Sequence, residues 1–441
     1  MLEWGVRIRH AYLWPGILVG ILLIIAAAVL SVVIAPNRYK GKIESAVTTA
    51  TGRRLELAGD IALSITRWIS LNTGNGVWRA DSHADSAPLA QWRSASIRVR
   101  LLPLLKGHVV LDVIRAQGLH LTVRRDAQGR SNWDLKPKHT VSTGRHDPGR
   151  TLAVGGIELA DASIDYEDRR ADLRARIDSL SLKTNEWTKG AEVRLRAKFH
   201  AMLGAASKPP SNADVGSDIT ITTRLQADPE LESFALHQTS LDARLTGGRL
   251  ASGGIAANLD VPRLAVVIDP LAIEVPTYAL DLDQSRTTGS LALEQTPAGL
   301  HARGPVQFLT ASARRIIGDL GLDTPLPRDP QTLGKVSVDG TWELTGGALK
   351  IQPLTVQIDA TRFDGELARS AGPRPRLTFD LHADRMDLGA YADVRSSHPA
   401  PFELPLDALR AFNAQGQIVV ERARLSDAQL KRVTLRVESH E

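Results

Sequence analysis

The sequence contains no cysteine among its 441 residues. Disulfide bonds, thiolate nucleophiles and cysteine-ligated metal sites are therefore excluded. The absence of cysteine suits a domain exported to an oxidising compartment. Aromatic residues make up only 5% of the chain, too few to form stacking platforms for nucleic acid bases. The net charge of +5 is spread along the chain without a compact basic block, which argues against nucleic acid as a partner.

Motifs for catalysis and for metal binding are also missing. The sequence has no G-x-S-x-G elbow, Walker A loop, H-E-x-x-H motif or EF-hand pattern. The 12 histidines are scattered without metal-ligand spacing, so we expect no metal site and no cofactor. Carboxylate pairs such as Asp281 with Asp283 are common on solvated strands. We therefore expect that the protein is not an enzyme, and a hydrolase that uses this pair is the alternative to test.

One long apolar run lies near the N-terminus. Residues 11–36 contain no charged side chain, and about 20 apolar residues suffice to cross a bilayer as a helix. The run is longer than the apolar core of a cleaved signal peptide. We predict a cytoplasmic segment at 1–10 and a single transmembrane anchor at 11–36. The residues that represent this anchor are Trp14, Pro15, Leu22, Ile25, Val29 and Ile34.

The segment at 37–52 has apolar residues near helical spacing and predicts a short amphipathic helix. Two interpretations remain open for it. The helix lies at the membrane surface or closes one end of the next domain, or it is a plain spacer.

From Arg53 onward, apolar and polar residues alternate with the period of two that is typical of strands. Clear examples are residues 97–101, 119–124 and 377–381. Helix is scarce, and the best later candidate is residues 310–320. An alternating strand has one apolar face, which a second sheet, a helix or a ligand must cover. The pattern predicts a mainly β chain, and it leaves open whether the strands form closed sandwiches or one curved sheet with an apolar groove.

Breaks in the pattern divide the chain. We expect an N-terminal β domain at 53–135, a linker at 136–150, repeated β units at 151–368 and a C-terminal β region at 369–441. Within these parts, alternation selects nine candidates for the lining of an apolar groove. They are Ile97, Val99, Leu101, Leu119, Leu121, Val123, Leu377, Phe379 and Leu381.

After the predicted anchor, several segments stand out: TGRRLELAGDI at 51–61, Arg67-Trp68, VRLLPLLKG at 99–107, LDVIRAQGLHL at 111–121 and RDAQGRSNW at 125–133. Two later segments are IDATRFDG at 358–365 and LHADRMDLGAY at 381–391. With the anchor, these segments resemble the AsmA family of Gram-negative envelope proteins, and the two later ones are the weaker matches. The family has Pro where this chain has Arg67. Many relatives continue beyond the strand that precedes Glu441, so a short or truncated member is expected.

The resemblance implies a protein anchored in the inner membrane, with the bulk of the chain in the periplasm. Such proteins are similar to bridge-like lipid transfer proteins, in which an elongated, curved antiparallel sheet forms a repeating groove. The implied function is to bind phospholipid acyl chains and to support phospholipid transport to, and assembly of, the outer membrane. The implied partners are phospholipids, the inner membrane and other envelope proteins. The alternative is a scaffold for outer-membrane proteins that acts through its strand edges.

Overall fold

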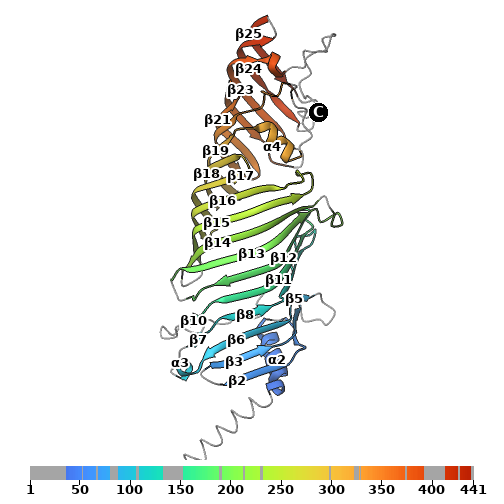
Figure 1. Cartoon of the computed structure of the whole chain (residues 1–441), viewed down its shortest axis with the longest axis vertical. Coiled ribbons are helices and arrows are strands. Elements are labelled where there is room, and N and C mark those ends of the chain that lie inside the picture. Colours follow the sequence, from blue (N-terminus) through green and yellow to red (C-terminus); the bar gives the residue numbers. More distant parts are fainter. Residues whose placement is uncertain are drawn as a thin grey trace, which may run out of the picture. The chain divides into compact units, whose positions relative to one another are not determined.

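Figure 1 shows the protein as a computed structural model. It describes residues 36–51, 53–65, 68–79, 88–105, 109–132, 152–187, 191–211, 214–228, 232–296, 299–321, 327, 329–372, 375–391, 413–425 and 428–438. The predicted cytoplasmic segment, the predicted linker and the predicted anchor up to residue 35 lie outside these ranges. Within them, no helix combines the length and the apolar character needed to cross a membrane.

The chain divides into two units, of which unit 1 comprises residues 1–172 and 178–188. Its described elements are η2 (Pro36–Tyr39), α2 (Lys40–Thr51), β1 (Leu55–Leu57), β2 (Ile61–Ile65), β3 (Trp68–Thr73), β4 (Gly76–Arg79), β5 (Pro88–Trp92), β6 (Ser94–Arg100), α3 (Leu101–Leu105), β7 (Val109–Leu111), β8 (Ile114–Gln117), β9 (His120–Arg125), β10 (Leu152–Val154), β11 (Ile157–Asp168) and part of β12 (Leu173–Thr184).

Two series of paired strands, here called the two arms of the sheet in unit 1, both begin at strand β11. Its first residues pair in parallel with β8 and its later residues pair in parallel with β9. From β8 the ladder continues through β6 and β3 to β2, and from β9 it continues through β5 and β4 to β1. Asp161, between the two paired stretches, has a left-handed φ of 52°. Arg93 lies between β5 and β6, which belong to different arms, and it forms an ion pair with Asp161. This ion pair links β11 to the chain at the point where the two arms separate.

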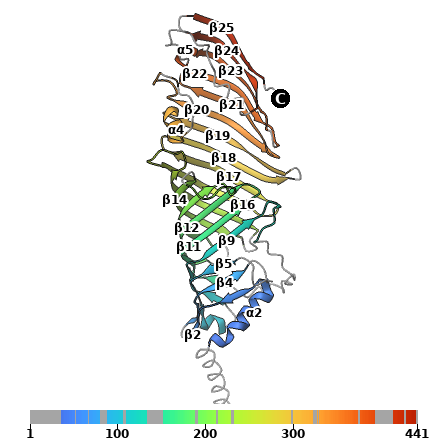
Figure 2. The same cartoon turned by 90° about the vertical axis from the view of Figure 1, so that its right-hand side faces the viewer.

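The segment η2–α2 bonds to the outermost strand of each arm. Glu44 Oε1 accepts a hydrogen bond from the backbone N–H of Leu57 in β1 at 2.7 Å. Asn37 Oδ1 accepts one from the backbone N–H of Ile61 in β2 at 2.9 Å. Figure 2 shows α2 at the same end of unit 1 as β2. Because the two side chains satisfy backbone donors that β-pairing leaves open, α2 closes this end of unit 1.

Unit 2 comprises residues 173–177 and 189–441. Its described strands are β13 (Val193–Gly204), β14 (Val215–Ala227), β15 (Ser233–Gly247), β16 (Ile255–Val267), β17 (Ala272–Leu282), β18 (Ser285–Thr296), β19 (Gly299–Thr310), β20 (Val336–Thr345), β21 (Ala348–Ile358), β22 (Thr361–Arg369), β23 (Leu377–Asp387), β24 (Ala414–Leu425) and β25 (Ala428–Val437). Its helices are α4 (Ala313–Asp319) and α5 (Leu388–Tyr391).

In unit 2 each strand from β13 to β25 pairs with the next one along the chain (Figure 2). All of these pairs are antiparallel except β23–β24, which is parallel. Polar and glycine-rich turns, such as the one between β20 and β21, join the antiparallel neighbours. The result is a single sheet in which sequence order equals spatial order.

The prediction of a mainly β chain with few short helices is confirmed. The helix predicted at 310–320 is α4, and the alternation at 377–381 lies in β23. The prediction of a purely antiparallel sheet is wrong in part, because β10 pairs in parallel with β7, β11 with β8 and β9, and β24 with β23. Long connections separate these partners in the sequence, and a parallel pair requires such a crossover.

We expect Glu44→Ala to destabilise the protein, because it leaves the backbone N–H of the buried Leu57 without its acceptor. A buried unsatisfied donor costs about 1–3 kcal/mol. The free energy of unfolding of the full chain in urea measures this loss. Ser45→Ala, one position along on the exposed side of α2, is the matched control and should change the free energy little. Equal values for the two variants would show that Glu44 does not cap β1.

Candidate functional site

One line of directly opposed residues crosses the sheet of unit 2, and nearly all of its members are apolar. It takes one residue from each strand in turn. The members are Ala197, Ile221, Leu241, Leu259, Leu280, Thr287, Phe308, Val338, Val356, Phe363, Ala383, Val420 and Val433. Directly opposed residues point to the same side of a sheet. We call the side that carries this line the apolar face of unit 2.

The neighbouring line points to the other side and is polar. It runs through Lys198, Thr220, Asp242, Asn258, Asp281, Arg286, Leu309, Ser337, Gln357 and Arg362. Leu309 is the one apolar member, and its side chain is exposed. Ion pairs lie on this side, for example Lys350 with Glu366 at 3.7 Å and Arg362 with Asp364 at 2.9 Å. From β13 to β22, the two sides of the sheet therefore differ in chemistry.

The apolar face is only partly shielded from solvent. Leu241, Leu259, Leu280, Phe308 and Val338 are half-buried, although each lies opposite at least one apolar residue of an adjacent strand. Within the described residues of unit 2, the strands form one sheet and the two helices are short, so no second sheet covers this face. An apolar surface of this extent is typical of a binding site, because soluble proteins rarely leave such surfaces uncovered.

Near its C-terminal end, the face contains a denser cluster. Phe363, Ala383, Val420 and Ala423 are buried there. Partly buried side chains, Leu381 among them, pack against this cluster.

Aromatic rings keep the face continuous where strands carry glycine. A Cβ atom at Gly289 would lie 2.8 Å from the hydroxyl oxygen of Tyr278, and one at Gly416 would lie 2.8 Å from the ring of Phe379. The rings thus occupy the space that a side chain on the neighbouring strand would fill. Burial raises the pKa of Tyr278, as expected for a phenol in apolar surroundings.

The predicted groove residues fall into both units. Leu377, Phe379 and Leu381 lie on β23 and share the apolar face of unit 2, opposite Ala414, Gly416 and Ile418 of β24. The remaining candidates lie in unit 1. The sequence did not single out the central members of the face, such as Phe308 and Val338, although the alternation of VSVDGTWEL at 336–344 is the same signal.

In unit 1, Ile97 and Val99 lie on β6 opposite Leu71 and Ile69 of β3. Leu121 and Val123 lie on β9 and are half-buried, and Leu119 directly precedes that strand.

Leu101 corrects the predicted strand at 97–101. It is the first residue of α3, so the alternation of β6 ends at Arg100. Pro103 cannot donate to a strand ladder, but it is tolerated in the first turn of a helix. Leu101 therefore does not extend the alternating side-chain pattern of β6.

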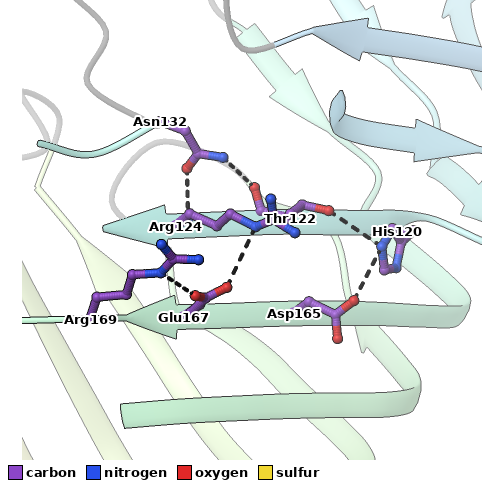
Figure 3. A network of polar contacts seen from close by, with 7 residues as sticks. All are labelled: His120, Thr122, Arg124, Asn132, Asp165, Glu167 and Arg169. Atoms are coloured by element: carbon purple, nitrogen blue, oxygen red, sulfur yellow. Dashed lines mark hydrogen bonds and ion pairs between the residues drawn. The ribbon is translucent and has the colours of Figure 1, made fainter. Parts of the chain in front are cut away.

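Polar side chains, most of them half-buried, join β9 to β11 in unit 1 (Figure 3). His120 Nδ1 lies 2.8 Å from Ser163 Oγ, and His120 Nε2 lies 3.4 Å from Asp165. Glu167 accepts a hydrogen bond from Arg169 at 2.6 Å. Serine, histidine and aspartate meet here, but they stand on paired strands that run regularly through the contact. The network holds two parallel strands together.

A family model for the AsmA family matches residues 8–415. The chain belongs to the AsmA family. No curated protein and no solved structure matches it.

Two segments that carry the AsmA resemblance meet in unit 1. The buried Arg53, just after α2, donates from Nη1 to the carbonyl oxygen of Asn132 at 3.0 Å. The side chain of Asn132 accepts from the backbone N–H of Arg124 at 2.8 Å and donates to the carbonyl of Thr122 at 2.7 Å (Figure 3). These AsmA-family residues therefore fix the turn after β9 against the start of the domain.

The acidic pair considered for hydrolysis is divided between two arginines. Asp281 lies 3.5 Å from Arg286, and Asp283 lies 3.4 Å from Arg315. Asp281 is on the polar side of the sheet, and Asp283 is in the turn after β17 with a φ of 49°. Each carboxylate has its own cation, so the geometry offers no shared proton for acid–base chemistry.

Val338→Asp should reduce the binding of an apolar fluorescent dye, because it places a charge at the centre of the apolar face. Ser337→Asp adds the same charge one residue away, on the polar side, and is the matched control. We expect the dye signal to fall several-fold in the first variant and to stay at the wild-type level in the second. An equal signal in all three proteins would mean that the dye does not use this face.

Proposed function

We propose that this AsmA-family chain is an inner-membrane-anchored periplasmic protein that holds phospholipid acyl chains on the apolar face of unit 2. In this role it supports phospholipid transport to, and assembly of, the outer membrane without catalysis. The observation that carries the proposal is the line of opposed apolar residues from β13 to β25, which is half-exposed over much of its length. Its proposed partners are phospholipids, the inner membrane and other envelope proteins.

The energetics favour an acyl chain as the occupant. Burial of each CH₂ group is worth about 0.8 kcal/mol, so about ten methylenes on this face would contribute on the order of 8 kcal/mol before ordering costs. The contact needs no directional bonds, and the face offers few polar groups. A chain held this way can slide from strand to strand, because adjacent members of the line, such as Phe308 and Val338, are chemically alike.

The scaffold alternative would use the free edge of a terminal strand. Within the described residues, β25 pairs with β24 on one side. Its sequence places Lys431, Arg432 and Arg436 along the strand, and Arg432 has a left-handed φ of 52°. Charges and backbone irregularity are features that discourage strand addition. They favour the lipid proposal over β-augmentation at this edge.

A photocrosslinking amino acid at Leu381 should capture phospholipid in cells, and the same group at His382 should not. The two positions are adjacent on β23, but Leu381 is on the apolar face and the exposed His382 is opposite Asp364 on the polar side. Mass analysis of the adducts provides the measurement. Adducts with outer-membrane protein precursors at either position, without lipid at Leu381, would overturn the proposal and favour the scaffold.

A further inference from the structure

Three basic residues form a row across the last strands of unit 2. Arg385 of β23 is opposite Arg422 of β24, and Arg422 is opposite Lys431 of β25. Like charges that face each other directly destabilise a sheet. Arg422 has an ion pair with the exposed Asp384 at 2.7 Å. Within the described residues, neither Arg385 nor Lys431 has a hydrogen-bond or ion-pair partner.

The row borders a cavity of about 770 Å³. The loop at 329–332, the turn after β21 and α5 supply the other walls. Arg314 of α4 holds the loop in place, because its Nη2 donates to the carbonyls of Pro327 and Asp329 at 2.8 and 2.7 Å. The cavity is therefore built by ordered elements on more than one side.

The acidic residues of the cavity have partners of their own. Asp359 accepts hydrogen bonds from two backbone N–H groups at 2.9 Å each and from the hydroxyl of Tyr391 at 2.6 Å. Asp387 is bonded to Arg424, which lowers the pKa of that carboxyl. Asp329 accepts from a backbone N–H of its own loop at 2.9 Å. These contacts leave the basic row as the part of the lining whose charge is least compensated.

The cavity is continuous with the apolar face. Met386 and Ala423 line the cavity, and both also belong to the hydrophobic cluster around Phe363 and Val420. A ligand in the cavity can thus contact cations and apolar side chains together. This combination fits an amphiphile with an anionic head.

We propose that the cavity binds the phosphate group of an anionic amphiphile through Arg385, Arg422 and Lys431, while its acyl chains extend over Met386 and Ala423 onto the apolar face. The inference rests on the proposed function and adds a headgroup site to it. Guanidinium and ammonium groups form strong, charge-assisted hydrogen bonds with phosphate oxygens. A bound phosphate would also relieve the repulsion within the row.

The test is calorimetric titration of the full-length protein in nonionic detergent with three ligands. Dioleoylphosphatidylglycerol carries chains and phosphate, dioleoylglycerol carries the chains alone, and inorganic phosphate carries the anion alone. The variant is the double substitution Arg385→Gln with Lys431→Gln. The control is Arg436→Gln, an exposed cation of β25 that is opposite Gln417 and outside the cavity.

We expect the double variant to bind phosphatidylglycerol at least about tenfold more weakly and to bind dioleoylglycerol as the wild type does. Arg436→Gln should match the wild type with both lipids. The unfolding midpoint of the double variant should equal or exceed that of the wild type, because two like charges are removed. A lower midpoint would instead indicate a structural row and overturn the proposal.

Unchanged phosphatidylglycerol binding in the double variant, or an equal loss in Arg436→Gln, would overturn the headgroup site while leaving acyl-chain binding intact. If the wild type binds neither lipid, the proposed function itself fails. The site is supported if the wild-type protein binds both phosphatidylglycerol and inorganic phosphate, and the double variant binds inorganic phosphate more weakly. If inorganic phosphate binds through the row and phosphatidylglycerol does not, the site takes free phosphate, and the amphiphile proposal is overturned.

Discussion

The alternation of side chains along a strand is the constraint on which unit 2 depends. In a single sheet with matched register, alternation separates apolar residues onto one face and polar residues onto the other. A sandwich would bury its apolar face against a second sheet, but the described part of unit 2 has one sheet and two short helices. Its cohesion must come from backbone ladders and from contacts between neighbouring strands, such as Leu241 with Leu259. Half-burial of the apolar face follows directly from this architecture.

Irregularities within strands preserve this separation. The register shifts within β16, β17 and β21 occur beside Pro262, Pro276 and Pro353. Proline cannot donate to a ladder, and a bulge is the place in a sheet where it is tolerated. Bulges also increase the local twist. After each shift, apolar residues are again opposite apolar residues, as Val266 is opposite Ile273, so the bulges bend the sheet without mixing its two faces.

Period-two alternation and turn residues are local signals, so the sequence predicted a mainly β chain and, in unit 2, the alternation at 377–381 that lies in β23. It could not decide between a sandwich and an open sheet, since alternation defines an apolar face but not what covers it. Parallel pairing was missed, because the partners β9 and β11 are joined by a long connection that carries no local signal. Leu101 was misplaced because alternation continued for one residue beyond the end of β6. The basic row was invisible for the same reason as the parallel pairs: Arg385 and Arg422 become neighbours only through the register of β23 with β24.

The position of the basic row follows from a change in the phase of alternation. Buried or packed positions are two residues apart along most of β23 and β24. After Ala383, however, the next packed residue is Met386, and after Val420 it is Ala423, so each of these steps is three residues long. Both strands thus have one extra residue between packed positions, and the two extra residues occur at matching positions along the strands. The parallel register keeps Arg385 opposite Arg422 in this stretch. With a strict period of two, Arg385 would share the face of Ala383, and Met386 would lie on the opposite face. The shift instead lets them border one cavity, which is the geometry that an amphiphile with a charged head requires.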